Sequence, residues 1–464
     1  MYLSQSLMER ENFGSKVGAI LAAAGSAVGL GNVWRFPIET GQNGGAAFII
    51  IYVLCILMLG LPIMISEFLI GRYTHANTAG AFRIVSNGSP WKWVGRMGVF
   101  TGWFILCYYV VVGAWTMHYT FLSVTNAFYE VPATEYEGIF NGFVSSPWMP
   151  TLWLLVFIVV IHFVITRGVQ SGIEKSAKVM MPTLFVITVF LAVCSVMLPG
   201  ATQGIEFLLK PDWSKVDSGV ILDAMGQAFY SLSLGMGCLC TYASYFDKKT
   251  PLAKSALNVA VIDTVIAIMA GFIIFPSVFN IGMNPNEVGV GASLTFISLP
   301  NVFQQALGDG SFLAVIFSTL FYFLLFVAAL TSAISLHEVA TAYVTEEFHL
   351  SRKKGALLVT VTVLVLGTLC SLSFGPLSGV ILFDRNIFSL FDDLSGRILL
   401  PVGGMLISIF AGWVLDRKLY RDEISNGGDL KTPYFKMLIF SLRYVAPVAI
   451  GLVLLDQLGL FSFL

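Results

Sequence analysis

The sequence predicts an all-α protein that crosses a membrane about eleven times, as two inverted repeats of five helices plus one extra helix. First, 56% of the 464 residues are hydrophobic and 11% are charged, whereas soluble proteins carry about 25% charged residues. Second, apolar stretches near the roughly 20 residues that span a bilayer recur along the whole chain. Third, two of these stretches, five spans apart, are interrupted by glycines. A membrane β-barrel would instead alternate apolar and polar residues.

A polar N-terminal segment, 1–13, precedes the spans and lacks the pattern of a cleavable signal peptide. We expect residues 14–198 to form the first repeat, 219–416 the second and 434–461 the extra helix. The expected spans, in order, are 14–40, 43–71, 94–124, 150–167, 174–198, 219–246, 254–280, 309–347, 355–373, 386–416 and 434–461.

The loops between these spans alternate in charge. Lys and Arg gather before the first span and after the second, fourth, sixth, eighth and tenth. The loops at 129–138 and 284–293, which belong to the other side, are acidic or sparsely charged. Because basic loops stay inside, the N-terminus is expected in the cytoplasm. An odd number of spans then places the C-terminus outside.

The two interrupted spans are the first and the sixth. The first contains GSAVGLGNVWRFP, residues 25–37, and the sixth contains SLSLGMGCL, residues 231–239. Gly and Pro are the residues least suited to a helix interior. The same element thus opens each five-helix half, and an odd number of spans per half inverts one half relative to the other. This pattern is typical of secondary transporters whose site lies at the broken helices. Close helix packing through Gly25 and Gly29 is the alternative interpretation.

A break at mid-depth frees backbone groups that must line a cavity, since each would cost several kcal/mol against lipid. Freed carbonyls can coordinate a cation, and amides at the start of the next half-helix suit a carboxylate. Asn32 adds a neutral oxygen, and Arg35 lies about one turn further toward the extracellular side. One broken helix therefore offers a site for a zwitterion and a hard cation.

Motifs along essentially the whole chain resemble the neurotransmitter:sodium symporters, in particular their bacterial amino-acid branch. The resemblance implies the LeuT-type fold, with helices 1 and 6 unwound at mid-membrane, and Na⁺-coupled uptake of an amino acid by alternating access. It also implies a location in the bacterial cytoplasmic membrane. The motifs are GSAVGLGNVWRFP (25–37), NGGAAF (43–48), EFLIGRY (67–73), YYVVVGAW (108–115), GQAFYSLSLGMG (226–237), TYASY (241–245), ALTSAIS (329–335) and LSRKK (350–354).

The resemblance implies two sodium sites and no organic cofactor. The first would use the carbonyl of Ala27, the side chains of Asn32 and Ser231, and the substrate carboxylate. Its remaining ligand is Asp263, where a leucine-transporting member of the family has Asn. An ionisable residue this deep in a membrane is functional by default, with a structural polar contact as the alternative.

Asp263 also affects whether transport is expected to need a chloride ion. A leucine-transporting member carries a Glu about one turn later, where this chain has Ala267. Tyr52, Gln227 and Ser231 resemble the shell of a chloride site. The carboxylate of Asp263 would replace the anion, so we predict chloride-independent transport.

The second sodium site would be built from neutral oxygens. The resemblance assigns to it the carbonyls of Gly25, Val28 and Ala328 and the hydroxyls of Thr331 and Ser332. Without the ALTS motif, these hydroxyls would be interpreted as contacts between packed helices or as bonds to their own helix.

The resemblance places the amino acid between the two breaks. Its carboxylate would meet two amides and the Tyr109 hydroxyl, and its ammonium would meet carbonyls and the Ser233 hydroxyl. The side-chain pocket is mainly apolar, and the flexible Met236 replaces a Phe of a leucine-transporting member. We therefore expect several hydrophobic amino acids, aliphatic and aromatic, with small or polar amino acids as the alternative. The substrate-binding residues are Ala27, Leu30, Gly31, Ile105, Tyr109, Tyr230, Ser231, Ser233, Met236, Ser332 and Leu336.

Two ion pairs are expected to gate the site. On the outside, Arg35 matches one partner of the family's pair and Asp392 the other, although the adjacent Asp393 leaves the choice of carboxylate open. On the inside, Arg10 and Glu346 match the cytoplasmic pair.

Gly172 and Pro182 enclose nine residues at the cytoplasmic start of the fifth span. Both weaken a helix. The element resembles one in a bacterial member that carries several hydrophobic amino acids, where it implies local unwinding that hydrates the second sodium site. A simple helix start with a proline kink is the alternative.

Other functions are disfavoured. The net charge is −1 and no basic tract is present, so nucleic acid is not an expected partner. The six cysteines form no CxxC motif, and LHEVA, residues 336–340, lacks the second His of a zinc protease, so it is interpreted as pocket and packing. We expect no enzyme and no obligate protein partner, only the amino acid and the lipid bilayer. A non-transporting receptor of the same fold is the remaining alternative.

Overall fold

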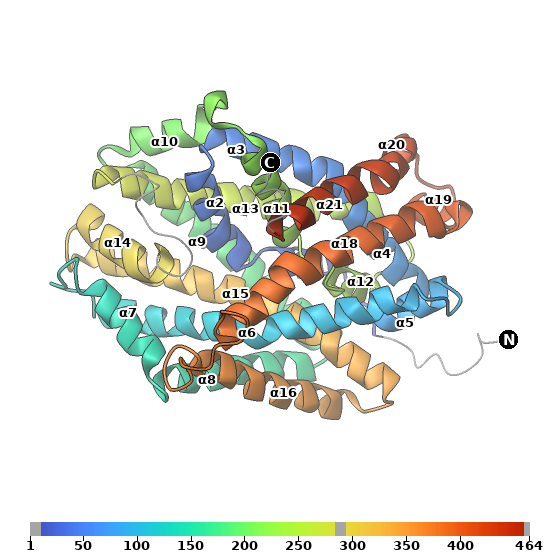
Figure 1. Cartoon of the computed structure of the whole chain (residues 1–464), viewed down its shortest axis with the longest axis horizontal. Helices are drawn as coiled ribbons and strands as arrows, with labels where there is room; N and C mark the ends of the chain where they lie inside the picture. The colour runs from blue at the N-terminus through green and yellow to red at the C-terminus, as the bar shows by residue number, and fades with distance from the viewer. Residues whose placement is uncertain (1–10, 284–293, 459–464) are drawn as a thin grey trace.

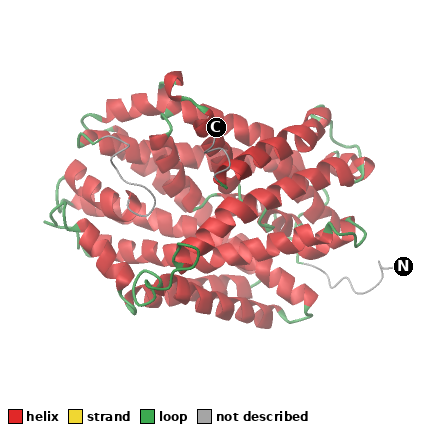
Figure 2. Cartoon of the chain, in the orientation of Figure 1, coloured by secondary structure: helices red, strands yellow, loops and turns green. Residues whose placement is uncertain are grey.

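The structure is a computed structural model that describes residues 11–283 and 294–458. The described chain is helical, with loops between the helices (Figure 2). Its long helices lie side by side along the longest axis of the molecule, with α6 and α15 through the middle (Figure 1). The prediction of an all-α membrane protein is confirmed. Arg10, the loop 284–293 and the end of the last span, 459–461, lie outside the described residues.

The described residues of the first half form ten α-helices, some extended by π-helical turns. They are α1 (Lys16–Ala27), α2 (Phe36–Gln42) after the turn Gly31–Arg35, α3 (Ala46–Cys55), the turn Ile56–Gly60, α4 (Leu61–Thr74), α5 (Thr78–Val85), α6 (Lys92–Val124), α7 (Tyr136–Ser145), α8 (Met149–Thr166), the turn Val169–Glu174, α9 (Lys175–Val196) and α10 (Ala201–Leu209).

The second half begins after a short 3₁₀ turn, Trp213–Lys215. Its helices are α11 (Ser218–Ser231), α12 (Cys238–Ala243), α13 (Leu252–Asn280), α14 (Leu299–Leu307) after the turn Leu294–Ser298, α15 (Phe312–Glu347), α16 (Arg352–Leu372), α17 (Ile387–Asp393), the turn Leu394–Leu399, α18 (Leu400–Ile409), the turn Phe410–Val414, α19 (Arg417–Ile424), α20 (Phe435–Phe440), the turn Ser441–Val445 and α21 (Ala446–Gln457).

Among the described residues, nine helical stretches are long and apolar enough to cross a membrane. A tenth span is broken: Lys16–Ala27 and Gly31–Gln42 meet at an angle of 52°. The expected sixth span is also interrupted, because α11 ends at Ser231 and α12 starts at Cys238. Neither α11, with 14 residues, nor α12, with six, is long enough to cross a membrane alone, and residues 232–237 separate them.

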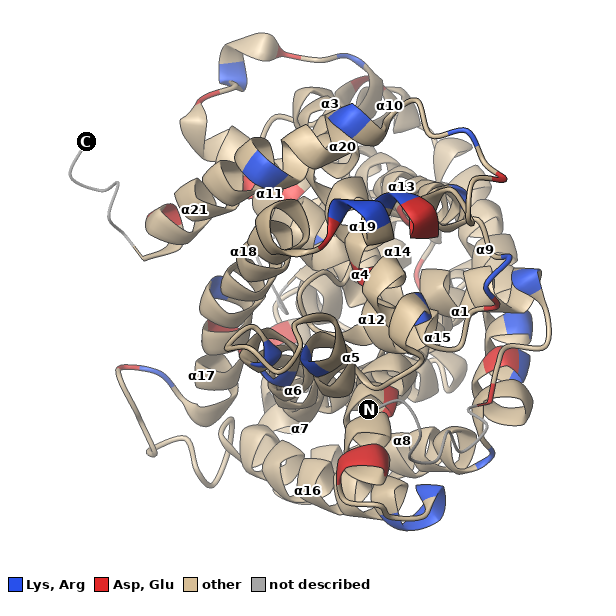
Figure 3. Cartoon of the chain, turned by 90° about the vertical axis from the view of Figure 1, so that its right-hand side faces the viewer, with Lys and Arg blue, Asp and Glu red and all other residues tan. Residues whose placement is uncertain are grey.

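Both interruptions lie inside the bundle. Val28 and Leu30 in the first and Leu232 and Leu234 in the second are at most 3% exposed. The longest helices, α6 and α15, pack against each other, and α1 lies against α13 and α15. Lys and Arg gather around α5, α6 and α19 at the end of the bundle near the N-terminus (Figure 3). The fold thus keeps the freed backbone groups away from lipid, as a break at mid-depth requires.

Candidate functional site

Side chains replace the helical hydrogen bonds at the first break. The Gly29 amide donates to Asn32 Oδ1 at 3.0 Å, and the Leu30 amide donates to the Tyr109 hydroxyl at 3.2 Å. A Cβ at Gly29 would lie 2.4 Å from the Ser332 oxygen and 2.9 Å from the Tyr109 oxygen. Only glycine fits here, because the backbone approaches the side chains of α6 and α15 directly.

At the second break the backbone changes direction through three residues with positive φ, namely Ser233, Gly235 and Gly237. The Ser233 hydroxyl donates to the Ser26 carbonyl at 2.9 Å and so ties the second break to the end of α1. The Gly235 amide donates to Glu67 Oε1 at 2.9 Å, a contact that sequence reasoning missed. The position of Glu67 in the middle of an apolar span could have indicated such a contact, because a carboxylate there needs polar partners.

Three polar side chains meet around the carboxylate of Asp263, which is fully buried in α13. One carboxylate oxygen accepts from Asn32 Nδ2 at 2.7 Å. The other accepts from the Ser231 hydroxyl at 2.7 Å and the Tyr52 hydroxyl at 3.4 Å. The structure therefore brings together three predicted residues of the first sodium site, Asn32, Ser231 and Asp263, with Tyr52 of the predicted chloride shell.

Gln227, also of that shell, lies beside this cluster. Its Nε2 donates to the Gly31 carbonyl at 3.0 Å, and its buried Oε1 has no hydrogen-bond partner among the described residues. Gln227 thus fixes the start of the half-helix that follows the first break. Ala27, the remaining predicted ligand, is the last residue of α1.

The predicted residues of the second sodium site also converge. Ser332 Oγ lies 3.5 Å from the Gly25 carbonyl oxygen and 3.2 Å from that of Val28. Thr331 Oγ1 lies 3.3 Å from the Val28 oxygen and 2.9 Å from the Ala328 oxygen. Three carbonyls and two hydroxyls form a neutral cluster of hard oxygens between α1 and α15, the donor type that suits an alkali cation.

A small pocket lies between the two clusters. Among its described lining residues none is charged. Leu30 and Ser231, both predicted to bind substrate, are not part of its lining, whereas Ser26, Gly29 and Ser335 are additional. Ser26 and Ser335 hydrogen-bond to each other at 2.9 Å across α1 and α15. The lining residues are Ser26, Ala27, Gly29, Gly31, Ile105, Tyr109, Tyr230, Ser233, Met236, Ser332, Ser335 and Leu336.

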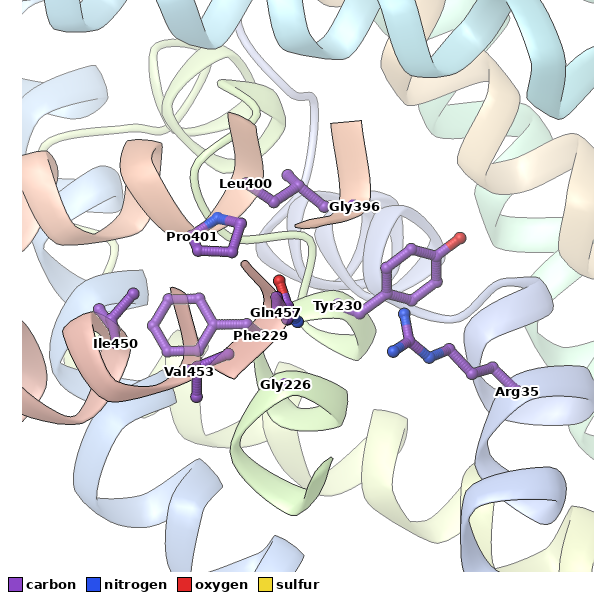
Figure 4. A pocket seen from close by; sticks show the side chains of 10 residues that line it. All are labelled: Arg35, Gly226, Phe229, Tyr230, Gly396, Leu400, Pro401, Ile450, Val453 and Gln457. Carbon is purple, nitrogen blue, oxygen red and sulfur yellow. The ribbon is translucent and has the colours of Figure 1, made fainter. Parts of the chain in front are cut away.

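Beyond Tyr109 and Tyr230, a second cavity of about 530 Å³ is lined by both Arg35 and Asp392. We call it the vestibule. The ion pair of Arg35 is with Glu39, at 3.2 Å, one turn along the same helix. The Arg35 guanidinium also lies over the Tyr230 ring, 4.8 Å from its centre (Figure 4). Glu39 was missed, although its spacing of four residues from Arg35 indicated such a pair.

Asp393, the alternative partner of Arg35, is held by other arginines. Its carboxylate lies 2.9 Å from Arg385 and 2.8 Å from Arg397. Both carboxylates line the vestibule with Arg35, but among the described residues Asp392 has no such ion pair, so it is the one left to meet Arg35.

At the opposite end, Glu346 accepts from the Asn77 amide at 2.7 Å and from its side chain at 2.9 Å.

The interpretation of LHEVA as pocket and packing is wrong for its glutamate. Glu338 is fully buried and is bound by Arg352, at 2.9 and 2.6 Å, and by the Tyr245 hydroxyl, at 2.7 Å.

The element between Gly172 and Pro182 is helical in this structure, so the expected unwinding is not its conformation here. Gly172 lies in the turn Val169–Glu174, and Pro182 lies inside α9. A Cβ at Gly172 would lie 2.0 Å from the Val164 carbonyl oxygen. Close packing against the end of α8 thus requires this glycine.

The chain belongs to the sodium:neurotransmitter symporter family, whose model matches residues 10–141 and 127–462. It is 36% identical to the uncharacterized sodium-dependent transporter YhdH of Bacillus subtilis over 97% of this chain and 98% of that protein. It is 32% identical to an uncharacterized sodium-dependent transporter of Haemophilus influenzae over 97% of this chain and 98% of that protein. The crystal structure of MhsT in complex with L-phenylalanine matches with a TM-score of 0.86 and 42% identity, over 97% of this chain and all of that one.

These comparisons confirm the predicted family and the LeuT-type fold. Both are those of sodium-coupled transporters and not of enzymes. The two oxygen clusters and the pocket between them lie at the broken helices, where secondary transporters of this kind bind their substrates and ions.

Proposed function

We propose that this protein is a symporter that uses the Na⁺ gradient to import hydrophobic L-amino acids, both aliphatic and aromatic, by alternating access. The pocket between the two oxygen clusters carries the proposal. Its described lining contains no carboxylate for a basic side chain and no cation for an acidic one. The phenylalanine bound to MhsT, which shares 42% of the sequence, supports an aromatic substrate.

The two oxygen clusters would hold two sodium ions. At the first, Asp263 supplies a negative charge beside Asn32 and Ser231, and the substrate carboxylate would complete the coordination. At the second, Thr331 and Ser332 would turn their hydroxyl protons away from the carbonyls when a cation enters. Shared contact between the first sodium and the substrate couples their binding. Because the Asp263 carboxylate would supply the negative charge that chloride would otherwise provide, transport would not need chloride.

The conformation supports an outward-facing state. The vestibule leads to Tyr109 and Tyr230, and the Glu338–Arg352 pair binds α15 to α16 at the other end. On closure, Arg35 would exchange Glu39 for Asp392. Unwinding near Gly172 would then hydrate the second sodium site from the cytoplasm.

The proposed setting is the bacterial cytoplasmic membrane, with the N-terminus inside, the C-terminus outside and the two five-helix repeats around the site. Equilibrium binding of labelled L-phenylalanine to purified protein tests the substrate class. We expect binding in NaCl and in sodium gluconate, loss of binding in KCl, and competition by leucine, isoleucine and tryptophan. Competition only by glycine, serine or charged amino acids would contradict the proposed substrate class.

A further inference from the structure

A groove lies at the start of α6, away from the substrate site. It encloses about 590 Å³ and reaches across to α18. Trp93 is 60% exposed and Phe100 46% exposed, although both are large and apolar. The side chains that shape it are Trp91, Trp93, Arg96, Met97, Phe100 and Leu406.

The groove has a regular construction. Trp93, Met97 and Phe100 are four and three residues apart on α6, so they lie on one face of the helix. Trp91 forms its inner wall, because its ring lies 5.6 Å from that of Phe410 beyond α18. One end is therefore fixed in the protein, while the outer face offers a continuous apolar surface.

Arg96 gives this apolar groove a positive charge. Its guanidinium lies over the Trp93 ring, 4.6 Å from the ring centre. Among the residues that the structure describes, no carboxylate is within ion-pair distance of Arg96. The neighbouring Glu347 binds Arg83 at 2.6 Å and interacts with Arg96 only over a longer distance. The charge of Arg96 is therefore available to an anion.

The groove also lies at a depth that suits a lipid headgroup. It begins where α6 begins, beside α5, at the end of the bundle where Lys and Arg gather (Figure 3). Trp is enriched where a membrane meets water, and cationic pockets between helices on the cytoplasmic side favour anionic headgroups. Exposed apolar side chains further along α6, such as Phe100, would then meet the acyl chains.

We propose that this groove is a binding site for an anionic phospholipid of the cytoplasmic leaflet. The phosphate would lie against Arg96 and Lys92, the first residue of α6, and one acyl chain would run along Met97, Phe100 and Leu406. The positive charges of Arg96 and Lys92 would favour an anionic headgroup. The apolar face of Met97, Phe100 and Leu406 would favour a lipid with acyl chains over a soluble anion. The bound lipid would hold α6 against α18.

Native mass spectrometry of delipidated protein, with phosphatidylglycerol and phosphatidylcholine added in equal amounts, tests the proposal. We expect wild-type protein to retain phosphatidylglycerol preferentially. Arg96→Gln should reduce this preference about fivefold, as expected for one cation near a charged leaflet. The matched control is Arg421→Gln, since Arg421, on α19, also lies over an aromatic ring, that of Phe435 at 5.8 Å, but does not line this groove. The control should keep the wild-type preference.

Equal retention of the two lipids by wild-type protein would overturn the proposal, as would equal effects of the two substitutions. A second measurement does not depend on the folding of the Arg96 variant. Phosphatidylglycerol with brominated acyl chains should quench the fluorescence of wild-type protein more than that of Trp93→Phe, and brominated phosphatidylcholine should show a smaller difference. No difference between the proteins with either lipid would place the lipid elsewhere.

Discussion

Replacing Asp263 by Asn tests the first sodium site most sharply. The substitution preserves size and leaves an oxygen that can accept from Ser231, but it removes the charge. In the wild type, both carboxylate oxygens are bound at 2.7 Å, one by Asn32 and one by Ser231, in a fully buried position. No other carboxylate hydrogen-bonds with this cluster among the described residues, so the variant has no replacement charge there.

The size of the effect follows from the charge. Two unit charges about 4 Å apart attract by about 4 kcal/mol at the effective dielectric constant of about 20 that suits protein sites. The amide oxygen of Asn retains part of the coordination, so we take half of this value. A loss of about 2 kcal/mol weakens Na⁺ binding about 30-fold. Loss of the Asp263 carboxylate charge should also allow chloride to bind beside Tyr52, Gln227 and Ser231.

The assay is the Na⁺ concentration that gives half-maximal binding of labelled phenylalanine, measured with chloride and with gluconate. Asp263→Asn should need about 30-fold more Na⁺, and chloride should partly restore its affinity. Asp393→Asn is the control, because Asp393 is paired with Arg385 and Arg397 away from the cluster. A wild-type Na⁺ dependence in Asp263→Asn, without any response to chloride, would show that Asp263 is not a ligand of the first sodium site.

Three further predictions concern the pocket and the cytoplasmic end. Tyr109→Phe removes the hydroxyl that binds the Leu30 amide, and should raise the KM for uptake about 5- to 10-fold; an unchanged KM would remove Tyr109 from the site. Met236→Phe narrows the pocket and should weaken competition by tryptophan about tenfold while sparing isoleucine; equal effects on both competitors would contradict it. Glu338→Ala and Arg352→Ala should each lower thermal stability, and the double variant should lose about 1–3 kcal/mol less than their sum; additive losses would show that the pair is not coupled.

Local sequence was enough to predict both interruptions, because closely spaced glycines weaken a helix wherever they fall. The clustering of Asn32 with Asp263, which lie 231 residues apart, came from family resemblance and not from periodicity. Thr331 and Ser332 were assigned in the same way. For such residues the motif carries tertiary information that composition and spacing do not contain.

The contacts that sequence reasoning missed depend on tertiary distances. Glu338 looked like a packing residue because its partners come from other helices: Arg352 begins α16, and Tyr245 follows α12. Glu67 meets the Gly235 amide only because the second break turns toward α4. The segment near Gly172 is helical here because the missing side chain permits close contact with α8, which is a packing effect rather than a propensity.

Accumulation of an amino acid, driven by a Na⁺ gradient, is the activity proposed for this site. Uptake of labelled L-phenylalanine into proteoliposomes, with Na⁺ outside and K⁺ inside at zero membrane potential, tests it most directly. We expect transient accumulation above the external concentration, which is lost when an ionophore dissipates the Na⁺ gradient and persists when gluconate replaces chloride. Accumulation that is the same with K⁺ on both sides, or Na⁺-dependent binding without any accumulation, would contradict it.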